Sequence, residues 1–315
     1  MMMLVYKNHN SQVITDLGKT FLIQKDYPNA IKCFEIAANN GSSDAILELA
    51  QMYMKGVGLE LNKKKAKQYF KVLSNKYNSD VAQYQLGMIY NGERKYAKSK
   101  KYFELSADQD NTDALMKLGL IYRDGLGVKK NPNQTYQYFN KAAKLGEKNA
   151  LFYLAVFCRD GFGTQKNINR ARRYYKLGCI YGVNESYLNL GFYYANNDNL
   201  DLAKYYWGIC DSPKAQYNLG IVYEEEKNYD EAKKMFEKAA KQNHSDSILA
   251  IGKLYINGFG VEENIDIGLE YIIKAARLNN NRAIQIINEV VDEFERYEDI
   301  HLTQKQLQAI KNYAF

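Results

Sequence analysis

A leucine or isoleucine followed directly by glycine or alanine recurs along the chain at a nearly regular interval. The small residues are Gly18, Ala50, Gly87, Gly119, Ala155, Gly191, Gly220 and Gly252, which lie 29 to 37 residues apart. In most copies an aromatic residue follows three positions later, and residues at i and i+3 share one face of a helix. Such intervals are typical of stacked helical hairpins, each of which buries its apolar face only against its neighbours. The 315 residues therefore predict a repeat array instead of domains with separate cores.

The second half of each repeat carries a pair of large residues, aromatic in most copies. We call the helix with the small residue the A helix and assign the pair to the following B helix. The pairs are Tyr69-Phe70, Tyr102-Phe103, Tyr138-Phe139, Tyr174-Tyr175, Tyr205-Tyr206, Met235-Phe236 and Tyr271-Ile272. The small residue allows the B helix to approach closely, and we expect the rings to fill the space between neighbouring hairpins. Much of the total of 28 tyrosines is thereby interpreted as repeat core.

Four Gly-x-Gly turns follow A helices at the same offset. They are Gly56-Val57-Gly58, Gly125-Leu126-Gly127, Gly161-Phe162-Gly163 and Gly258-Phe259-Gly260. Glycine permits the positive φ of a helix C-cap, and we expect the apolar middle residue to turn back under the hairpin. A phosphate-binding loop would need a preceding strand and usually a Gly-Lys-Ser/Thr ending, and the sequence has neither. The three prolines, Pro28, Pro132 and Pro213, stand where a helix should begin.

Composition excludes several other classes of protein. With 46% hydrophobic and 25% charged residues the chain is too apolar for a disordered polymer, and no apolar run approaches the roughly 18 residues of a membrane span. The first ten residues lack the features of a signal peptide, so we expect an uncleaved, cytoplasmic protein. Four cysteines without Cys-x-x-Cys spacing predict buried thiols, and three widely spaced histidines predict no metal site.

The segment from Ala114 to Gly146 resembles a Sel-1-like repeat. It contains Leu118-Gly119 and Gly125-Leu126-Gly127-Val128 of the A-x-x-x-L-G-x-x-Y-x-x-G-x-G-V signature, and Lys141-Ala142-Ala143 of the K-A-A-x-x-G signature. Residues 246–281 match almost as well, whereas residues 215–240 lack the Gly-x-Gly turn and resemble a tetratricopeptide repeat. The resemblance covers roughly residues 11–297.

This resemblance implies an all-α fold, a right-handed α-solenoid of antiparallel helix pairs. It implies about eight Sel-1-like or tetratricopeptide-like repeats and a C-terminal helical cap. We expect an N-terminal tail at residues 1–10, the repeat array at residues 11–281 and capping helices at residues 282–315, the last of them at residues 304–313. The units without a Gly-x-Gly turn make the superhelix less regular.

A second face of each A helix is available for binding. The positions −3, +1, +4 and +5 from the small residue form a stripe, the A-helix stripe, that is apolar in its middle and polar along one edge. Such a surface suits an extended or amphipathic peptide, and packing against the adjacent repeat is the alternative for each position. Six of the predicted partner-binding residues lie on this stripe, and two lie beside it at position −2. The eight residues are Arg123, Arg159, Asn189, Phe192, Tyr217, Asn218, Ile221 and Lys253.

Two asparagines at position −2, Asn189 and Asn218, occur in adjacent repeats. They resemble the groove asparagines with which tetratricopeptide repeats hold the main chain of a peptide, and the alternative is that both merely face solvent. Lys253 in the next repeat is positioned to meet a carboxylate of the partner. These residues predict a polar clamp beside an apolar groove formed by Phe192, Tyr217 and Ile221.

Proteins that resemble this chain act as adaptors, so the predicted function is a non-enzymatic scaffold that binds a protein or peptide. No Ser/His/Asp or Cys/His constellation supports catalysis, and we expect no cofactor. The net charge of +7 is small beside 43 basic and 36 acidic residues, and Asp124, Asp160 and Glu224 on the stripe argue against nucleic acid. A secreted or host-delivered bacterial effector that binds a host protein with the same scaffold is the alternative function.

Overall fold

The computed structural model describes residues 11–296 and residue 310. Within this part of the chain the secondary structure is α-helix joined by turns and short loops, without a strand. The predicted tail at residues 1–10, and all of the predicted last helix except residue 310, lie outside the described residues. The chain divides into two compact units, Met1–Ile168 and Asn169–Phe315.

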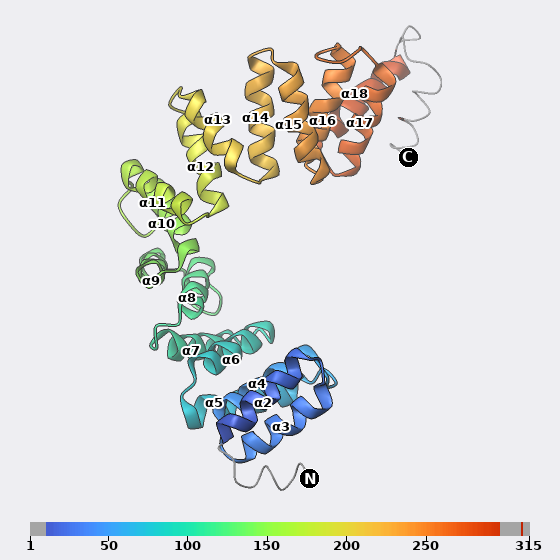
Figure 1. The fold of residues 1–315 in the computed structure, drawn as a ribbon. Helices are drawn as coiled ribbons and strands as arrows, with labels where there is room; N and C mark the ends of the chain where they lie inside the picture. Colours follow the sequence, from blue (N-terminus) through green and yellow to red (C-terminus); the bar gives the residue numbers. More distant parts are fainter. Residues whose placement is uncertain (1–10, 297–309, 311–315) are drawn as a thin grey trace. The chain divides into compact units, whose positions relative to one another are not determined.

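Both units are built from helices in the predicted alternation, with the A helices even-numbered and the B helices odd-numbered (Figure 1). The first unit contains α2 (Ser11–Ile23), α3 (Tyr27–Asn39), α4 (Ser43–Lys55), α5 (Lys63–Tyr77), α6 (Asp80–Gly92), α7 (Tyr96–Ala107), α8 (Thr112–Asp124), α9 (Pro132–Lys144) and α10 (Lys148–Asp160). The second contains α11 (Ile168–Ile180), which begins at the boundary, α12 (Asn184–Ala195), α13 (Leu200–Ile209), α14 (Pro213–Glu225), α15 (Tyr229–Lys241), α16 (Ser245–Asn257), α17 (Ile265–Arg277) and α18 (Asn281–Arg296). From α2 to α10 and from α12 to α18 each helix packs against the next, which confirms the predicted α-solenoid.

The recurring glycine of the A helix lies against an aromatic ring of the following B helix in five repeats, at Gly18, Gly87, Gly119, Gly191 and Gly220, whereas Gly252 lies against the carbonyl of Gly268 and the side chain of Ile272. A Cβ atom added at Gly119 would lie 2.7 Å from Cε2 of Phe139, and one added at Gly87 would lie 2.6 Å from Cδ1 of Phe103. Both phenylalanines are buried, with at most 1% of their surface exposed. The close approach predicted for the small residue is therefore confirmed, since any side chain there would displace a ring that cannot move into solvent.

The other member of each aromatic pair stacks on the A-helix tyrosine that follows the glycine by three positions. Ring centroids are 5.4 Å apart for Tyr90 and Tyr102 and 5.7 Å apart for Tyr122 and Tyr138, with nearly parallel planes. Both pairs join the two helices of one hairpin, whereas the sequence predicted rings between hairpins. Phe139 also reaches the next hairpin, with its centroid 4.5 Å from that of Tyr153. The tyrosines are thus repeat core, as predicted, but most of their stacking is internal to a repeat.

The Gly-x-Gly turns have two functions in the fold. The first glycine of each turn is the C-cap of an A helix in the left-handed conformation, as predicted, at Gly56, Gly125, Gly161 and Gly258, with φ between 65° and 78°. The second glycine packs against the first residue of the preceding B helix, and a Cβ atom there would clash with Tyr27, Tyr96, Pro132 or Tyr229. The second glycine therefore serves the contact between repeats.

One middle residue departs from the expected position under its own hairpin. Phe259 is 39% exposed, and its ring stacks on Tyr229 of the preceding B helix with centroids 4.7 Å apart. All three prolines lie in the first turn of a helix, Pro28 in α3, Pro132 in α9 and Pro213 in α14. Since the N–H groups of the first turn have no partner within the helix, proline costs nothing there.

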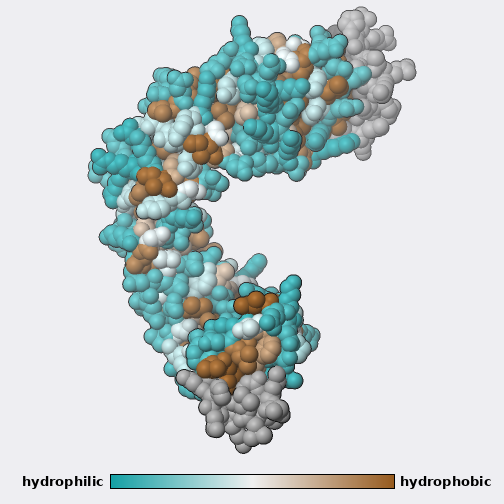
Figure 2. All heavy atoms as spheres, in the orientation of Figure 1, coloured by the Kyte–Doolittle hydropathy of each residue, from teal (hydrophilic) through white to brown (hydrophobic). Residues whose placement is uncertain are grey.

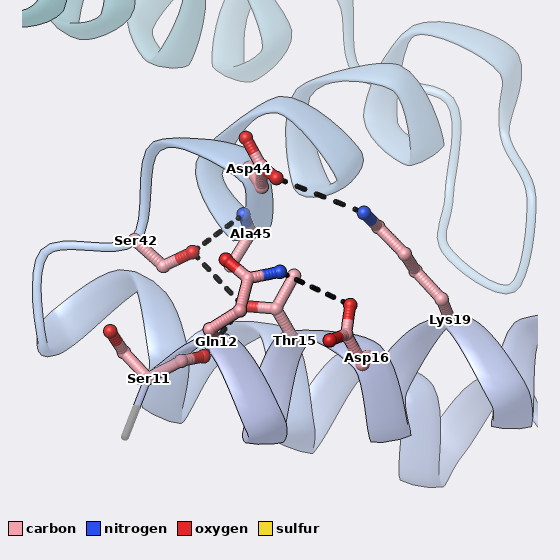
Figure 3. Close-up of polar contacts among 8 residues, drawn as sticks. All are labelled: Ser11, Gln12, Thr15, Asp16, Lys19, Ser42, Asp44 and Ala45. Atoms are coloured by element: carbon pink, nitrogen blue, oxygen red, sulfur yellow. Dashed lines mark hydrogen bonds and ion pairs between the residues drawn. The ribbon is translucent and has the colours of Figure 1, made fainter.

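Polar side chains at the start of some A helices join one A helix to the one before it. Figure 3 shows this contact between α2 and α4, where Ser42 caps α4 by accepting from the N–H of Ala45 at 3.2 Å. The same hydroxyl lies 2.9 Å from the buried hydroxyl of Thr15, which also contacts the carbonyl of Ser11 at 2.8 Å. These bonds satisfy buried polar groups and set the register of the two helices.

Asparagine makes the same kind of contact twice more. Asn111 caps α8 and donates to Asp80 at the start of α6, with 2.9 Å between Nδ2 and Oδ2. Asn280 accepts from the N–H of Ala283 at the start of α18 and donates to Asp246 of α16 at 2.7 Å. Because an amide both accepts and donates, one side chain caps its own helix and binds the preceding A helix.

Candidate protein-binding surface on the A helices

In the first unit the two arginines predicted for binding each pair with the next residue. Nε of Arg123 donates to Oδ1 of Asp124 at 2.7 Å, and Nη2 donates to Oδ2 at 3.0 Å. Arg159 makes the same two bonds with Asp160, at 2.7 and 2.9 Å. The guanidinium groups lower the pKa of both carboxyls, so the aspartates stay ionised. Each arginine therefore presents a neutralised pair at the end of its A helix, instead of an uncompensated positive charge.

In the second unit the side-chain amide of Asn189 on α12 forms hydrogen bonds with other residues of the protein. Its Nδ2 donates to the carbonyl of Glu185 at 2.7 Å, and its Oδ1 accepts from the hydroxyl of Tyr175 at 3.3 Å. Phe192, one turn further along α12, is 39% exposed and packs edge-on against Trp207, with centroids 5.5 Å apart. On α12, the exposed ring of Phe192 is available as apolar surface for a partner, whereas the amide of Asn189 already forms hydrogen bonds within the protein.

The neighbouring α14, which contacts α12 directly, carries three of the predicted residues. Tyr217 and Ile221 are half-buried, and the ring of Tyr217 packs between those of Phe236 and His244, with centroids 5.8 and 5.2 Å away. Asn218 is half-buried too, and its amide makes no hydrogen bond with any residue in the described part of the chain. The two asparagines that share position −2 therefore differ, because only Asn218 keeps its full hydrogen-bonding capacity.

Lys253 on α16 is exposed and lies near Glu224 on α14. Burial raises the pKa of Glu224, while the positive charge of Lys253 acts in the opposite direction. The structure thus brings Lys253 onto the same surface as the residues of α14. Its charge is partly compensated by Glu224, another residue of the stripe.

A surface cavity of about 600 Å³ in the first unit lies on the A-helix stripe between α4 and α6. Met54 of α4 and Met88 of α6 line it, together with Gln85 at the position that corresponds to Asn189 and Asn218. The start of α5 forms its rim with Lys63 and Lys64. Met88 occupies position +1 of the stripe, but the sequence did not predict the cavity, because its rim belongs to a B helix.

A smaller cavity of about 300 Å³ lies beside the first, between α2 and α4, and is lined by Leu22, Ile23 and Gln51. In the second unit a cavity of similar volume lies away from the stripe, between α13, α14 and α15, near Trp207 and Met235. On the face shown in Figure 2, apolar residues form separate small patches within a mostly hydrophilic surface. The apolar surface available to a partner is therefore discontinuous on that face.

Three further observations concern the described residues only. They contain no cluster of three or more histidine, cysteine, aspartate or glutamate side chains arranged to hold a metal ion. Within the same ranges, no helix combines the length and apolarity that crossing a bilayer would require. All four cysteines are buried and unbridged, as predicted.

Comparison with known proteins supports the repeat assignment. The family model described as "Sel1 repeat" matches residues 17–42, 43–75, 80–111, 112–147, 148–179 and 245–280, and the tetratricopeptide repeat model matches residues 213–246. No curated protein matches the chain.

Two solved structures are similar in fold to this chain. One is a Sel1 repeat protein from Oxalobacter formigenes, with 23% sequence identity and a TM-score of 0.73, covering 90% of this chain and 88% of the other. The second is a protective antigen present in uropathogenic Escherichia coli strains and displaying an SLR fold, with 20% identity, a TM-score of 0.57 and coverage of 96% and 83%. At this level of identity the similarity concerns the fold alone.

Proposed function

Since this chain belongs to the Sel1 repeat family, whose repeats generally form protein–protein interaction scaffolds, we propose that it is a non-enzymatic scaffold that binds a segment of a partner protein on its A helices. The repeat array is proposed to span residues 11–281, between a tail and capping helices at residues 282–315. The carrying observation is the half-buried amide of Asn218, which has no partner among the described residues and lies on the same helix as Tyr217 and Ile221. A peptide main chain would supply the missing hydrogen bonds, and its side chains would cover the apolar residues.

The electrostatics favour a protein over a nucleic acid as the partner. The stripe carries Asp124, Asp160 and Glu224, and the arginines nearest to two of them are already paired. A phosphate backbone approaching these three residues would meet carboxylates, and the arginines beside Asp124 and Asp160 are already bound to them. A peptide with both polar and apolar groups has no such penalty.

Displaced pKa values give no support for a catalytic role. Burial raises the pKa of Cys179 to about 12, which makes its thiol a poor nucleophile. Hydrogen bonds from Lys67 and Lys95 lower the pKa of Glu93 to about 2, which makes its carboxylate a poor general base. Both displacements arise from packing and ion pairing of the repeat fold.

We place the protein in the cytoplasm, because its four buried cysteines are unbridged and a secreted scaffold would use such residues in disulfides. The scaffold of a host-delivered effector would bind its partner with the same surface. The cytoplasmic adaptor is the proposal that the cysteines favour.

The proposed function is tested by affinity purification of the full chain from its native cells, with quantitative mass spectrometry and measurement of the partner's affinity. Asn218→Ala should weaken binding by about 1–3 kcal/mol if the amide makes buried hydrogen bonds, and should leave the melting temperature nearly unchanged. Asn189→Ala should lower the melting temperature, because it removes bonds to Glu185 and Tyr175.

Asn149→Ala is the matched control, since Asn149 is exposed on α10 and lies outside the stripe. It should change neither property. Wild-type affinity in the Asn218→Ala protein would refute the role of this amide. The absence of any specific partner, together with turnover of a small molecule by the purified chain, would refute the scaffold function.

A further inference from the structure

The cavity between α4 and α6 lies in a part of the array where the A helix α6 is not followed by a Gly-x-Gly turn. In the repeats that have the turn, its second glycine packs against the first residue of the preceding B helix. The turn after α6 contains only Glu93, Arg94 and Lys95, so it leaves the start of α5 uncovered. A recess of about 600 Å³ lies here, with Lys63 and Lys64 at its rim.

The floor of this cavity is apolar and adaptable. Met54, Met88 and Ile89 line it, and all three are half-buried. Methionine side chains are flexible and polarizable, so they can adjust to several apolar side chains of a partner. Gln85 adds an amide at the edge, with no hydrogen bond to any other residue that the structure describes.

The rim carries positive charge that the fold does not compensate. Lys63 and Lys64 are exposed and form no ion pair within the described ranges. They stand in the first turn of α5, which contains no acidic residue, although a helix N-terminus favours negative charge. A carboxylate bound here would therefore interact favourably with both ammonium groups and with the end of the helix.

The carboxylate nearest to the cavity does not neutralise this rim. Glu93 accepts hydrogen bonds from Lys67 at 2.6 Å and from Lys95 at 2.8 Å. Lys67 also lies over the ring of Tyr90, with its Nζ 3.9 Å from the centroid. The charged side chains that line the cavity are therefore three lysines and one glutamate, and this glutamate already accepts hydrogen bonds from Lys67 and Lys95.

We propose that this cavity docks an acidic segment of a partner protein, with apolar side chains seated on Met54 and Met88 and carboxylates facing Lys63 and Lys64. The inference rests on the proposed scaffold function and gives the chemistry of one partner. A single-stranded nucleic acid would require aromatic stacking platforms, whereas this floor is aliphatic. A lipid bilayer would require a protruding apolar face, whereas this surface is recessed.

The test uses the full chain and a display library of randomised 16-residue peptides. Enriched peptides should be acidic, with apolar residues spaced three or four positions apart, and their affinity should fall as the salt concentration rises. The affinity of each fluorescein-labelled peptide is then measured by fluorescence anisotropy. Lys63→Glu plus Lys64→Glu should weaken binding of the peptide about tenfold or more. Met88→Glu, which changes the floor of the cavity and leaves both rim lysines in place, should also weaken binding about tenfold or more.

The control is Lys32→Glu plus Lys129→Glu, which makes the same change in net charge at two exposed lysines outside the cavity. It should leave the affinity within about twofold, because distant surface charges are screened. Circular dichroism establishes that every variant is folded. Enriched peptides that are not acidic, or that bind the Lys63→Glu plus Lys64→Glu protein with wild-type affinity, would overturn this inference while the scaffold function stands.

Two other results are equally decisive. An oligonucleotide or a vesicle containing phosphatidylserine that binds in a Lys63- and Lys64-dependent manner, without enriched acidic peptides, would replace the proposed partner. If no peptide is enriched and a native partner binds in a manner that depends on Asn218, the proposal that the cavity docks an acidic segment is overturned, whereas the proposed scaffold function stands.

Discussion

Replacing Gly220 with alanine should destabilise the second unit by overpacking. The added Cβ atom would lie 2.5 Å from Cδ1 and 2.9 Å from Cζ of Phe236, whereas ordinary contact begins at 3.4 Å. Phe236 is 0% exposed, so the ring cannot turn into solvent to make room. Helices α14 and α15 must therefore separate by several tenths of an ångström, or the ring must leave its preferred rotamer, at a cost of about 1–3 kcal/mol.

Backbone effects oppose this cost and must be removed by a control. Alanine in place of a helical glycine stabilises by roughly 1 kcal/mol, chiefly through backbone entropy. Gly208 on α13 is also helical, belongs to the same unit and would have nothing within 4 Å of an added Cβ atom. Gly208→Ala should therefore stabilise, and the difference between the two variants should isolate the overpacking of about 1–3 kcal/mol.

Urea unfolding followed by the fluorescence of Trp207 provides the assay. The chain has a single tryptophan, and it is buried within the second unit, so its signal reports on the unit that carries both substitutions. Phe236→Leu in the Gly220→Ala protein should recover part of the loss, since the smaller side chain relieves the contact. Equal changes in the free energy of unfolding for Gly220→Ala and Gly208→Ala would refute the close-contact role of the glycine.

Asn280→Ala should lower the stability of the second unit by about 1–3 kcal/mol in the same assay, because it removes the cap of α18 and leaves Asp246 without its 2.7 Å bond; an unchanged midpoint would contradict the register role. His244 caps α16 through Nδ1, and burial holds its pKa below the ordinary 6.5. The unfolded chain therefore binds the proton more readily, so the stability contributed by neutral His244 is present above pH 6.5 and is lost as the pH falls through the lowered pKa. Urea midpoints between pH 7.5 and 5.5 should decline less in His244→Asn, which keeps the cap without titrating, and parallel declines would show that another group is responsible.

The candidate site was only partly accessible to sequence reasoning. Helical periodicity placed Tyr217, Asn218 and Ile221 together on α14, because residues at these spacings share one side of a helix. It did not distinguish Asn218 from Asn189, which have the same position in the repeat. The difference arises from the hydroxyl of Tyr175, 14 residues earlier in the chain, which binds the amide of Asn189.

The pairing of arginine with aspartate shows the same limit. Arg123 and Arg159 are predicted to contact a partner, and in the structure each is also bound by the next residue at the end of its helix. The sequence contained the signal, since Arg-Asp precedes the Gly-x-Gly turn in both repeats. Only the structure shows that the arginine and aspartate side chains at the end of each helix are close enough to form an ion pair.

The sequence by itself determined the repeat, its helix pairs and the glycine at their closest contact. These features depend on residues within about one repeat of each other, and local spacing encodes which helix face each residue occupies. Tertiary structure alone decided how one repeat meets the next, including the contact of the second turn glycine with the preceding B helix and the bonds of Asn111 and Asn280 to earlier A helices. It also decided that a cavity lies beside Lys63, because that depends on the packing of three helices whose side chains meet only in the folded protein.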